Sequence, residues 1–188
     1  MRTKSVLGLA ALGFMLLSCQ SNSYKINGFA LQLEEGDTIL IAHDSDRLQP
    51  FAMTIVNGGI FFWEGDINDV EPCWVYLKRR PECNAFYFPD NGTIAIELNL
   101  PPTPSRVSGT LLNNKWQHLN DSIQRIGKNI ISLMEQKDSD TLAHMTKHKR
   151  VDSLHYLMSA LIINTGKRNK GNPLGNFILE NYKEPEFK

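Results

Sequence analysis

The hydrophobic pattern changes its period near residue 110 and divides the chain into two parts. Before this point, short apolar or β-branched runs alternate with turn residues, which predicts β-strands. After it, apolar residues recur every three or four positions, the spacing of one face of an α-helix. The sequence therefore predicts an α+β fold, with an antiparallel β-sandwich or small barrel over 24–110 and a two- to three-helix C-terminal arm over 111–188.

Turn chemistry marks the ends of the expected strands. Residues 57–59 are Asn-Gly-Gly and separate the apolar runs 51–56 and 60–63. Asn-Gly between two such runs is the strongest short signal for a β-hairpin. Further short runs, such as 73–77 and 85–88, flank polar turns in the same way. Regular short strands with these turns are typical of a sandwich or a small barrel.

The expected helical arm begins with an amphipathic helix for which Asn113 or Asn114 is a suitable N-cap. Residues 138–140 break the pattern and can cap a second helix, and a short third helix is expected over 174–182. The apolar face of the first helix consists of Trp116, Leu119, Ile123, Ile126, Ile130 and Leu133, and that of the second consists of Leu154, Leu157, Met158 and Leu161.

Short amphipathic helices are marginal in water and gain their stability from packing an apolar face. We expect the first helix to pack on the β domain through Trp116, Ile123 and Ile130. The second and third helices are expected to be less stable and to provide a surface for a protein partner.

The N-terminus has the layout of a secretory signal peptide. Arg2 and Lys4 precede an uncharged, mostly apolar stretch over 5–18, which is shorter than the roughly 20 residues of a membrane-spanning helix. The stretch ends Leu-Leu-Ser before Cys19, which resembles a bacterial lipobox, where cleavage precedes a lipid-modified, palmitate-bearing cysteine. We expect a lipoprotein signal peptide over 1–18, a lipid on Cys19 and a polar tether over 19–23. An ordinary signal peptide with an incidental cysteine is the alternative.

The residues after Cys19 indicate in which membrane the protein is anchored, and the overall charge indicates which class of partner is unsupported. By resemblance to other lipoproteins, the absence of Asp after Cys19 argues against retention in the inner membrane. The periplasmic side of the outer membrane is therefore expected, ahead of the inner membrane or the cell surface. The chain has 20 basic and 20 acidic residues, and loss of Arg2 and Lys4 leaves 18 basic ones. This balance gives no support for nucleic-acid binding.

Two cysteines follow the lipobox, Cys73 and Cys83. They do not form a C-x-x-C motif, and their spacing resembles neither a thioredoxin active site nor a zinc knuckle. The periplasm is oxidising, so a structural disulfide between them is one interpretation. The alternative is that both are small, half-buried hydrophobic residues in neighbouring strands.

No residue pattern completes a catalytic or metal-binding constellation, and no cofactor is expected. His144 and His148 have the i, i+4 spacing of a metal-binding pair on a helix, but the polar edge of an amphipathic helix is the favoured interpretation. The run 43–46, His-Asp-Ser-Asp, contains hydrolase residue types but is interpreted as a turn, since a triad is assembled in space.

Four Asp-(Ser/Thr)-aliphatic triplets resemble periplasmic O-glycosylation sites, at Thr38, Ser122, Thr141 and Ser153.

Four segments, in order behind the lipobox, resemble the uncharacterised β-rich N-terminal domain of periplasmic thiol-disulfide interchange lipoproteins. They are 26–28 (Ile-Asn-Gly), 54–65 with its Asn-Gly-Gly turn, 88–96 (Phe-Pro-Asp-Asn-Gly-Thr-Ile-Ala-Ile) and 107–113. The resemblance covers about 24–113, and the helices that follow resemble the family's linker. No position of this chain matches the C-x-x-C of the family's thioredoxin-like domain.

The resemblance implies a fold, a compartment and an accessory role. The expected function is that of a non-catalytic periplasmic lipoprotein, a binding or accessory module associated with thioredoxin-like systems. Its membrane contact would be the lipid on Cys19, and a protein partner would bind the helical arm. Two alternatives are a redox-active accessory that uses Cys73 and Cys83, and a carbohydrate or small-ligand binder that uses Trp63, Trp74 or Trp116.

Overall fold

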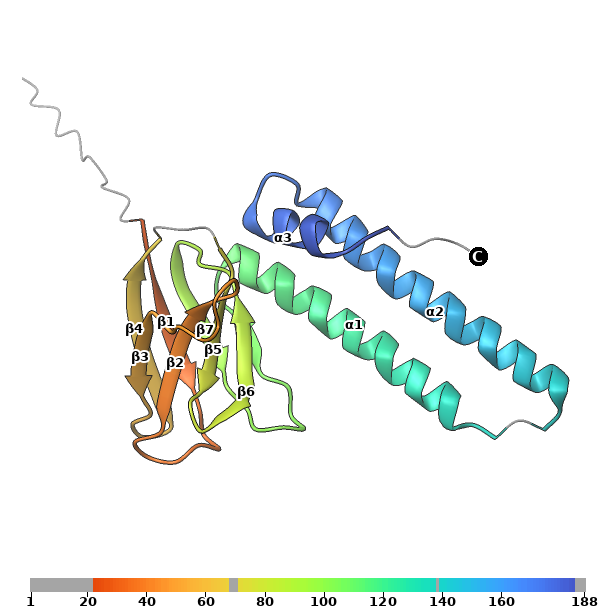
Figure 1. Cartoon of the computed structure of the whole chain (residues 1–188), viewed down its shortest axis with the longest axis horizontal. Helices are drawn as coiled ribbons and strands as arrows, with labels where there is room; N and C mark the ends of the chain where they lie inside the picture. Colours follow the sequence, from red (N-terminus) through yellow and green to blue (C-terminus); the bar gives the residue numbers. More distant parts are fainter. Residues whose placement is uncertain (1–21, 68–70, 138, 185–188) are drawn as a thin grey trace, which may run out of the picture.

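The computed structural model describes residues 22–67, 71–137 and 139–184, and Cys19 lies outside them. Two layers of β-strands form one end of the molecule, and a long helical hairpin extends from them (Figure 1). The fold is α+β with a sandwich-like arrangement of two four-stranded sheets and three C-terminal helices. The sheets do not form a closed barrel, so the sandwich alternative is confirmed.

The first sheet has the strand order β4-β1-β7-β8, and the second has the order β3-β2-β5-β6. The first sheet consists of β4 (Ile60–Asp66), β1 (Ser23–Phe29), β7 (Gly92–Glu97) and β8 (Arg106–Ser108). The second consists of β3 (Ala52–Ile55), β2 (Thr38–His43), β5 (Cys73–Leu77) and β6 (Arg80–Tyr87). The pairing is antiparallel except between β1 and β7, which are parallel, so the predicted antiparallel sandwich holds with this one exception.

The Asn-Gly turn at 57–59 connects the two sheets. Asn57 and Ile60 exchange backbone hydrogen bonds, as in a tight hairpin. The strands on either side then separate, because β3 pairs with β2 and β4 pairs with β1. The predicted hairpin is therefore limited to the turn, and each flanking run covers its own half of the core.

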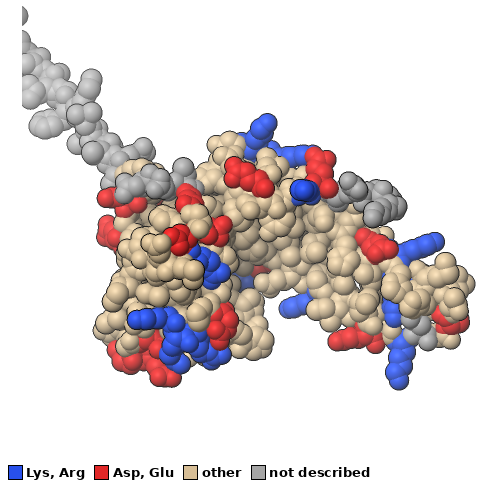
Figure 2. Space-filling view, in the orientation of Figure 1, with Lys and Arg blue, Asp and Glu red and all other residues tan. Residues whose placement is uncertain are grey.

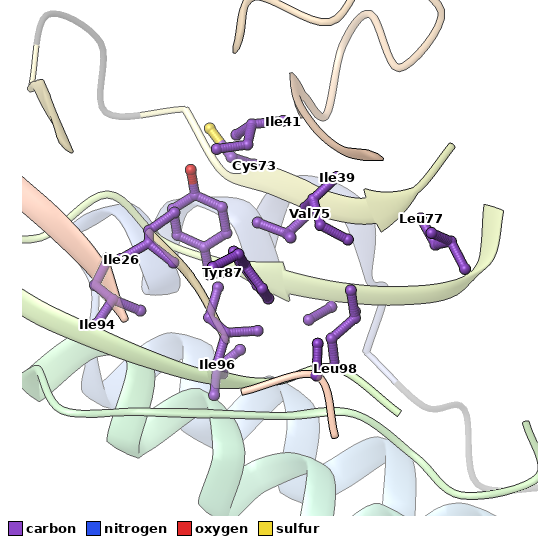
Figure 3. Close-up of a cluster of buried hydrophobic side chains, with 14 of the residues drawn as sticks. Ile26, Ile39, Ile41, Cys73, Val75, Leu77, Tyr87, Ile94, Ile96 and Leu98 are labelled. Carbon is purple, nitrogen blue, oxygen red and sulfur yellow. The ribbon is translucent and has the colours of Figure 1, made fainter. Parts of the chain in front are cut away.

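The sandwich core lies between the sheets, where alternate side chains of the strands meet (Figure 3). Its fully buried members include Ile26, Ile39, Ile41, Val75, Leu77, Tyr87, Ile94, Ile96 and Leu98. Gly28 on β1 lies opposite Phe61 on β4, whose ring occupies the space that a Cβ at position 28 would fill. The glycine in the expected opening strand thus allows Phe61 to reach the core.

The helical arm consists of α1 (Leu111–Glu135), α2 (Thr141–Arg168) and α3 (Pro173–Asn181). Asp140 caps α2 by accepting a hydrogen bond from the Ala143 amide, in agreement with the predicted break. The N-cap of α1 is Thr110, so the assignment of Asn113 or Asn114 as the cap is wrong. None of these three described helices combines the length and apolar character that a bilayer crossing requires.

The predicted apolar face of α2 is only partly correct. Met158 and Leu161 pack against the cluster at the root of the arm, but Leu157 is exposed. The buried apolar residues of α2 are instead Val151, Ile162 and Ile163. The reason is that α2 is covered by α1 along one side and by α3 near its C-terminal end, so different residues face a neighbour along its length.

Candidate functional site

An aromatic cluster joins the arm to the outer face of the second sheet. Phe86 near the end of β6 and Phe88 directly after it meet Trp116 of α1 and Phe177 of α3, with ring centroids 4.9–6.0 Å apart. Trp74 of β5 contacts the edge of this cluster at 4.9 Å from Phe86. Pairs of rings at such separations add about 0.5–1.5 kcal/mol each beyond their area burial, so this cluster holds the arm in a fixed orientation.

Asparagine 113 locks the strand end to the start of α1. The Phe88 amide donates to Asn113 Oδ1 at 2.9 Å, and Asn113 Nδ2 donates to the Phe88 carbonyl at 2.8 Å and to Thr110 Oγ1 at 2.8 Å. The side chain is fully buried, so these bonds have no access to water. Asn113 is therefore a structural clamp between the two parts of the chain.

A second set of polar contacts joins α1 to β8. The Val107 amide donates to Gln117 Oε1 at 2.8 Å, and Gln117 Nε2 donates to Asp121 Oδ1 at 2.8 Å. Arg106 reaches both oxygens of Asp121, at 3.0 and 2.9 Å, and these bonds lower the pKa of that carboxyl. The first half of α1 is thus fixed on both sheets.

The packing of the arm confirms one part of the expectation and corrects another. Trp116 of α1 packs on Phe86 and Phe88 of the sandwich side, as predicted. Ile123 packs against the cluster that these rings form with α2 and α3, and Ile130 is not a member of it. The third helix does not offer an open surface, because Leu174 and Ile178 of α3 are fully buried beside α1 and the strand end. The third helix lies close to the sandwich because the chain reverses direction between the end of α2 and the start of α3 (Figure 1). The helical pattern of the sequence does not reveal this reversal.

Exposed apolar side chains gather at the far end of the hairpin, which we call the hairpin tip and define as residues 128–137 and 139–150. Four large apolar side chains there are each more than half exposed: Ile131, Met134, Leu142 and Met145. The two helices enclose shallow hollows of about 430 and 520 Å³, both bordered by Leu133, Gln136 and Arg150. The hairpin tip therefore combines exposed apolar residues with recesses on a support that is fixed at its root.

The two cysteines are buried, and both are thiols that do not take part in a disulfide. Cys73 on β5 lies opposite Tyr87 on β6, and Cys83 lies four residues before Tyr87. At about 3.4 Å per residue, a separation of four residues places the two cysteines roughly 14 Å apart along the strands, whereas a disulfide requires Cα atoms within about 7 Å. The disulfide interpretation is therefore wrong for this fold, and both residues are fully rather than half buried.

A thiol and an imidazole meet at one end of the sandwich core. Cys73 Sγ lies 3.7 Å from His43 Nδ1, and Glu71 Oε2 lies 3.9 Å from the same nitrogen. Cys73 occupies the end of the core near the Tyr87 hydroxyl, which forms a 2.9 Å hydrogen bond with Tyr24 (Figure 3). Burial raises the pKa of both tyrosines.

This group does not have the geometry of a nucleophilic relay. A general base takes the proton of the nucleophile at one ring nitrogen while a carboxylate orients the other. Here the thiol and the carboxylate approach the same nitrogen of His43. Cys83 is not activated either, since burial raises its pKa to about 11 and so disfavours the reactive thiolate. Sequence reasoning missed the approach of His43 to Cys73, because the two residues are paired only through the register of β2 and β5.

The remaining predicted positions lie on separate surfaces. The rings of His144 and His148 are 4.3 Å apart on the exposed face of α2. Within the described residues, no group of three or more potential ligands surrounds them or any other point. Of the four glycosylation candidates, Thr141 and Ser153 are exposed on α2, while Thr38 on β2 and Ser122 on α1 are half-buried.

The three tryptophans do not converge on one point. Trp63 borders a small pocket of about 290 Å³ with Tyr24, Phe51 and Cys73. Trp74 and Trp116 both line a groove of about 390 Å³ between β6, the segment 99–105 and α1. The structure therefore brings two of the three sequence candidates together.

Comparison with known proteins adds no relative to these observations. No family model matches the chain, and a search of curated proteins finds no significant match.

Proposed function

We propose that this chain is a non-catalytic, lipid-anchored accessory protein of the periplasm that binds a protein partner with its hairpin tip. The single observation that carries the proposal is the contrast along the arm. Its root is fixed by the aromatic cluster and the Asn113 clamp, whereas its tip leaves Ile131, Met134, Leu142 and Met145 exposed. Exposed apolar side chains grouped on a rigid support are a common feature of protein interfaces.

The proposed partner class is a thioredoxin-like protein of the same compartment. The support is the resemblance of residues 24–113 to the N-terminal domain of thiol-disulfide interchange lipoproteins. In that arrangement the anchored chain would position the partner rather than transfer electrons, because its two thiols are buried and far apart. The alternative in which Cys73 and Cys83 form a redox pair requires β5 and β6 to separate.

The charge distribution is compatible with a protein partner. Basic and acidic side chains are interspersed on the face that Figure 2 shows, and an uncharged area covers the junction of sandwich and arm. Exposed charges of one sign do not dominate this face, so strong attraction to a polyanion has no support here.

Photocrosslinking in the native cell tests the proposal. A photoreactive amino acid replaces Met145 in the hairpin tip, and the matched control replaces Leu48, which is an exposed apolar residue on the sandwich. We expect a discrete crosslinked product at Met145 that contains a thioredoxin-like protein, and none at Leu48. A product without such a domain would refute the partner class, and equal or absent crosslinking at both positions would refute the role of the tip.

A further inference from the structure

A second surface, distinct from the hairpin tip, has the chemistry of a ligand site. The groove of about 390 Å³ at the junction lies between the outer face of β6, the segment 99–105 and the first turns of α1. This volume is within the ~300–1,000 Å³ typical of small-molecule sites. We propose that this groove binds a neutral saccharide.

Aromatic rings form one wall of the groove. Trp74, Phe86 and Trp116 line it, and both indoles are half-buried. The indole N–H of Trp74 donates to Asp44 Oδ1 at 2.6 Å. The guanidinium of Arg47 lies 3.9 Å above the Trp74 ring. These contacts hold Trp74 in place before any ligand arrives, so the wall is preorganised and costs little entropy on binding.

Neutral amides form the other wall. Asn84 Nδ2 donates to the Pro81 carbonyl at 2.7 Å, and Asn99 Nδ2 donates to the Pro104 carbonyl at 3.1 Å. Each bond orients the amide and leaves its Oδ1 as an acceptor. The side-chain amide of Asn120, on α1, has no hydrogen-bond partner among the described residues and can both donate and accept.

The balance of these groups favours hydroxyl ligands. No lysine or arginine lines the groove, and its one carboxylate, Glu82, is engaged by Arg80 at 3.0 Å. A phosphate or carboxylate would find no free cation there. A peptide needs donors for its carbonyls, but the oriented side-chain atoms are mainly acceptors. Sugar hydroxyls can donate to these acceptors, while the C–H face of the ring packs on the indoles.

NMR titration of the purified full chain, with Cys19→Ala for solubility, tests this assignment. A glycan array of neutral and acidic oligosaccharides first identifies the probes, and a proline-rich peptide is added to the set. The indole N–H resonances supply an internal comparison, because Trp74 and Trp116 line the groove and Trp63 lies in a different pocket. We expect a neutral sugar to shift the first two resonances and leave that of Trp63 unchanged.

Two matched variants locate the site. Asn120→Ala should weaken the sugar about fivefold or more, the effect of losing one or two hydrogen bonds. Gln124→Ala, which removes an exposed amide on the same helix outside both the groove and the hairpin tip, should leave affinity unchanged. The proposal is overturned if no neutral sugar on the array binds, if only the peptide or an acidic glycan shifts Trp74 and Trp116, or if Asn120→Ala binds like the wild type. None of these results depends on the partner proposed for the hairpin tip.

Discussion

Replacement of Asn113 by alanine should destabilise the protein far more than the same change at Asn114. Asn113 is fully buried and makes three hydrogen bonds, of which two satisfy the amide and the carbonyl of Phe88. Alanine leaves both backbone groups without their partner in a buried position. An unsatisfied buried group costs about 1–3 kcal/mol, so we expect a loss of about 3 kcal/mol in the free energy of unfolding.

The adjacent asparagine is the matched control. Asn114 Oδ1 accepts a hydrogen bond from the Gly109 amide at 3.0 Å, but this contact is exposed and water can replace it. Asn114→Ala should therefore cost about 0.5 kcal/mol or less. Both substitutions remove the same side chain from the first turns of α1, so their difference isolates the buried clamp.

Urea denaturation of the two variants and the wild type measures this difference. In a parallel thermal unfolding experiment on a chain of this size, a loss of 3 kcal/mol corresponds to a fall in Tm of about 6–12 °C. An unchanged m value would show that the effect lies in stability rather than in the compactness of the unfolded chain. The reasoning fails if Asn113→Ala and Asn114→Ala differ by less than about 0.5 kcal/mol.

Three further predictions use other parts of the chain. Cys19→Ala should abolish metabolic labelling by palmitate and move the protein from the membrane to the soluble fraction, and continued membrane attachment would contradict the lipobox. The Asp37 side chain accepts two hydrogen bonds from Arg79, which lower its pKa, so Asp37→Asn should cost about 1 kcal/mol at neutral pH. Because the folded pKa lies below the ordinary 3.8, this difference should be present above pH 3.8 and disappear as the pH falls through the folded value, as acid titrations of both proteins would show. In the Cys19→Ala protein, Cys73 and Cys83 should react slowly with Ellman's reagent until guanidinium exposes two thiols, whereas a disulfide would give none.

The two ends of the arm differ in how much apolar surface they bury. At its root, Trp116 and the buried residues of α3 make the helices part of the sandwich. At its tip, Leu133 is the only buried apolar residue among the described ones, and the buried Val151 lies just beyond the tip. Hydrogen exchange should accordingly be slow near the root, α3 included, and faster across the hairpin tip.

The period of the hydrophobic pattern, read from the sequence alone, determined the fold class and the boundary near residue 110. Alternation buries one face of a strand, and three-four spacing buries one face of a helix, so these features follow from local geometry. Asp140 as a helix cap belongs to the same group, since a cap depends on residues within one turn. The signal-peptide pattern and the lipobox are likewise local, and the lipid on Cys19 is a prediction from sequence that lies outside the described residues.

The pairing of distant segments was decided only by the tertiary structure. The Asn-Gly turn predicts a hairpin, but its two flanking runs enter different sheets because each has a better partner elsewhere. The register of β5 and β6 separates the two cysteines, and the register of β2 and β5 places His43 beside Cys73. Asn113 resembles a helix cap locally, yet it binds the backbone of Phe88, which lies 25 residues earlier and directly after β6. The groove that Trp74 and Trp116 share also depends on the packing of α1 against β5 and β6. A contact between segments far apart in the chain leaves no periodic signal in either segment, so the sequence alone does not reveal this groove.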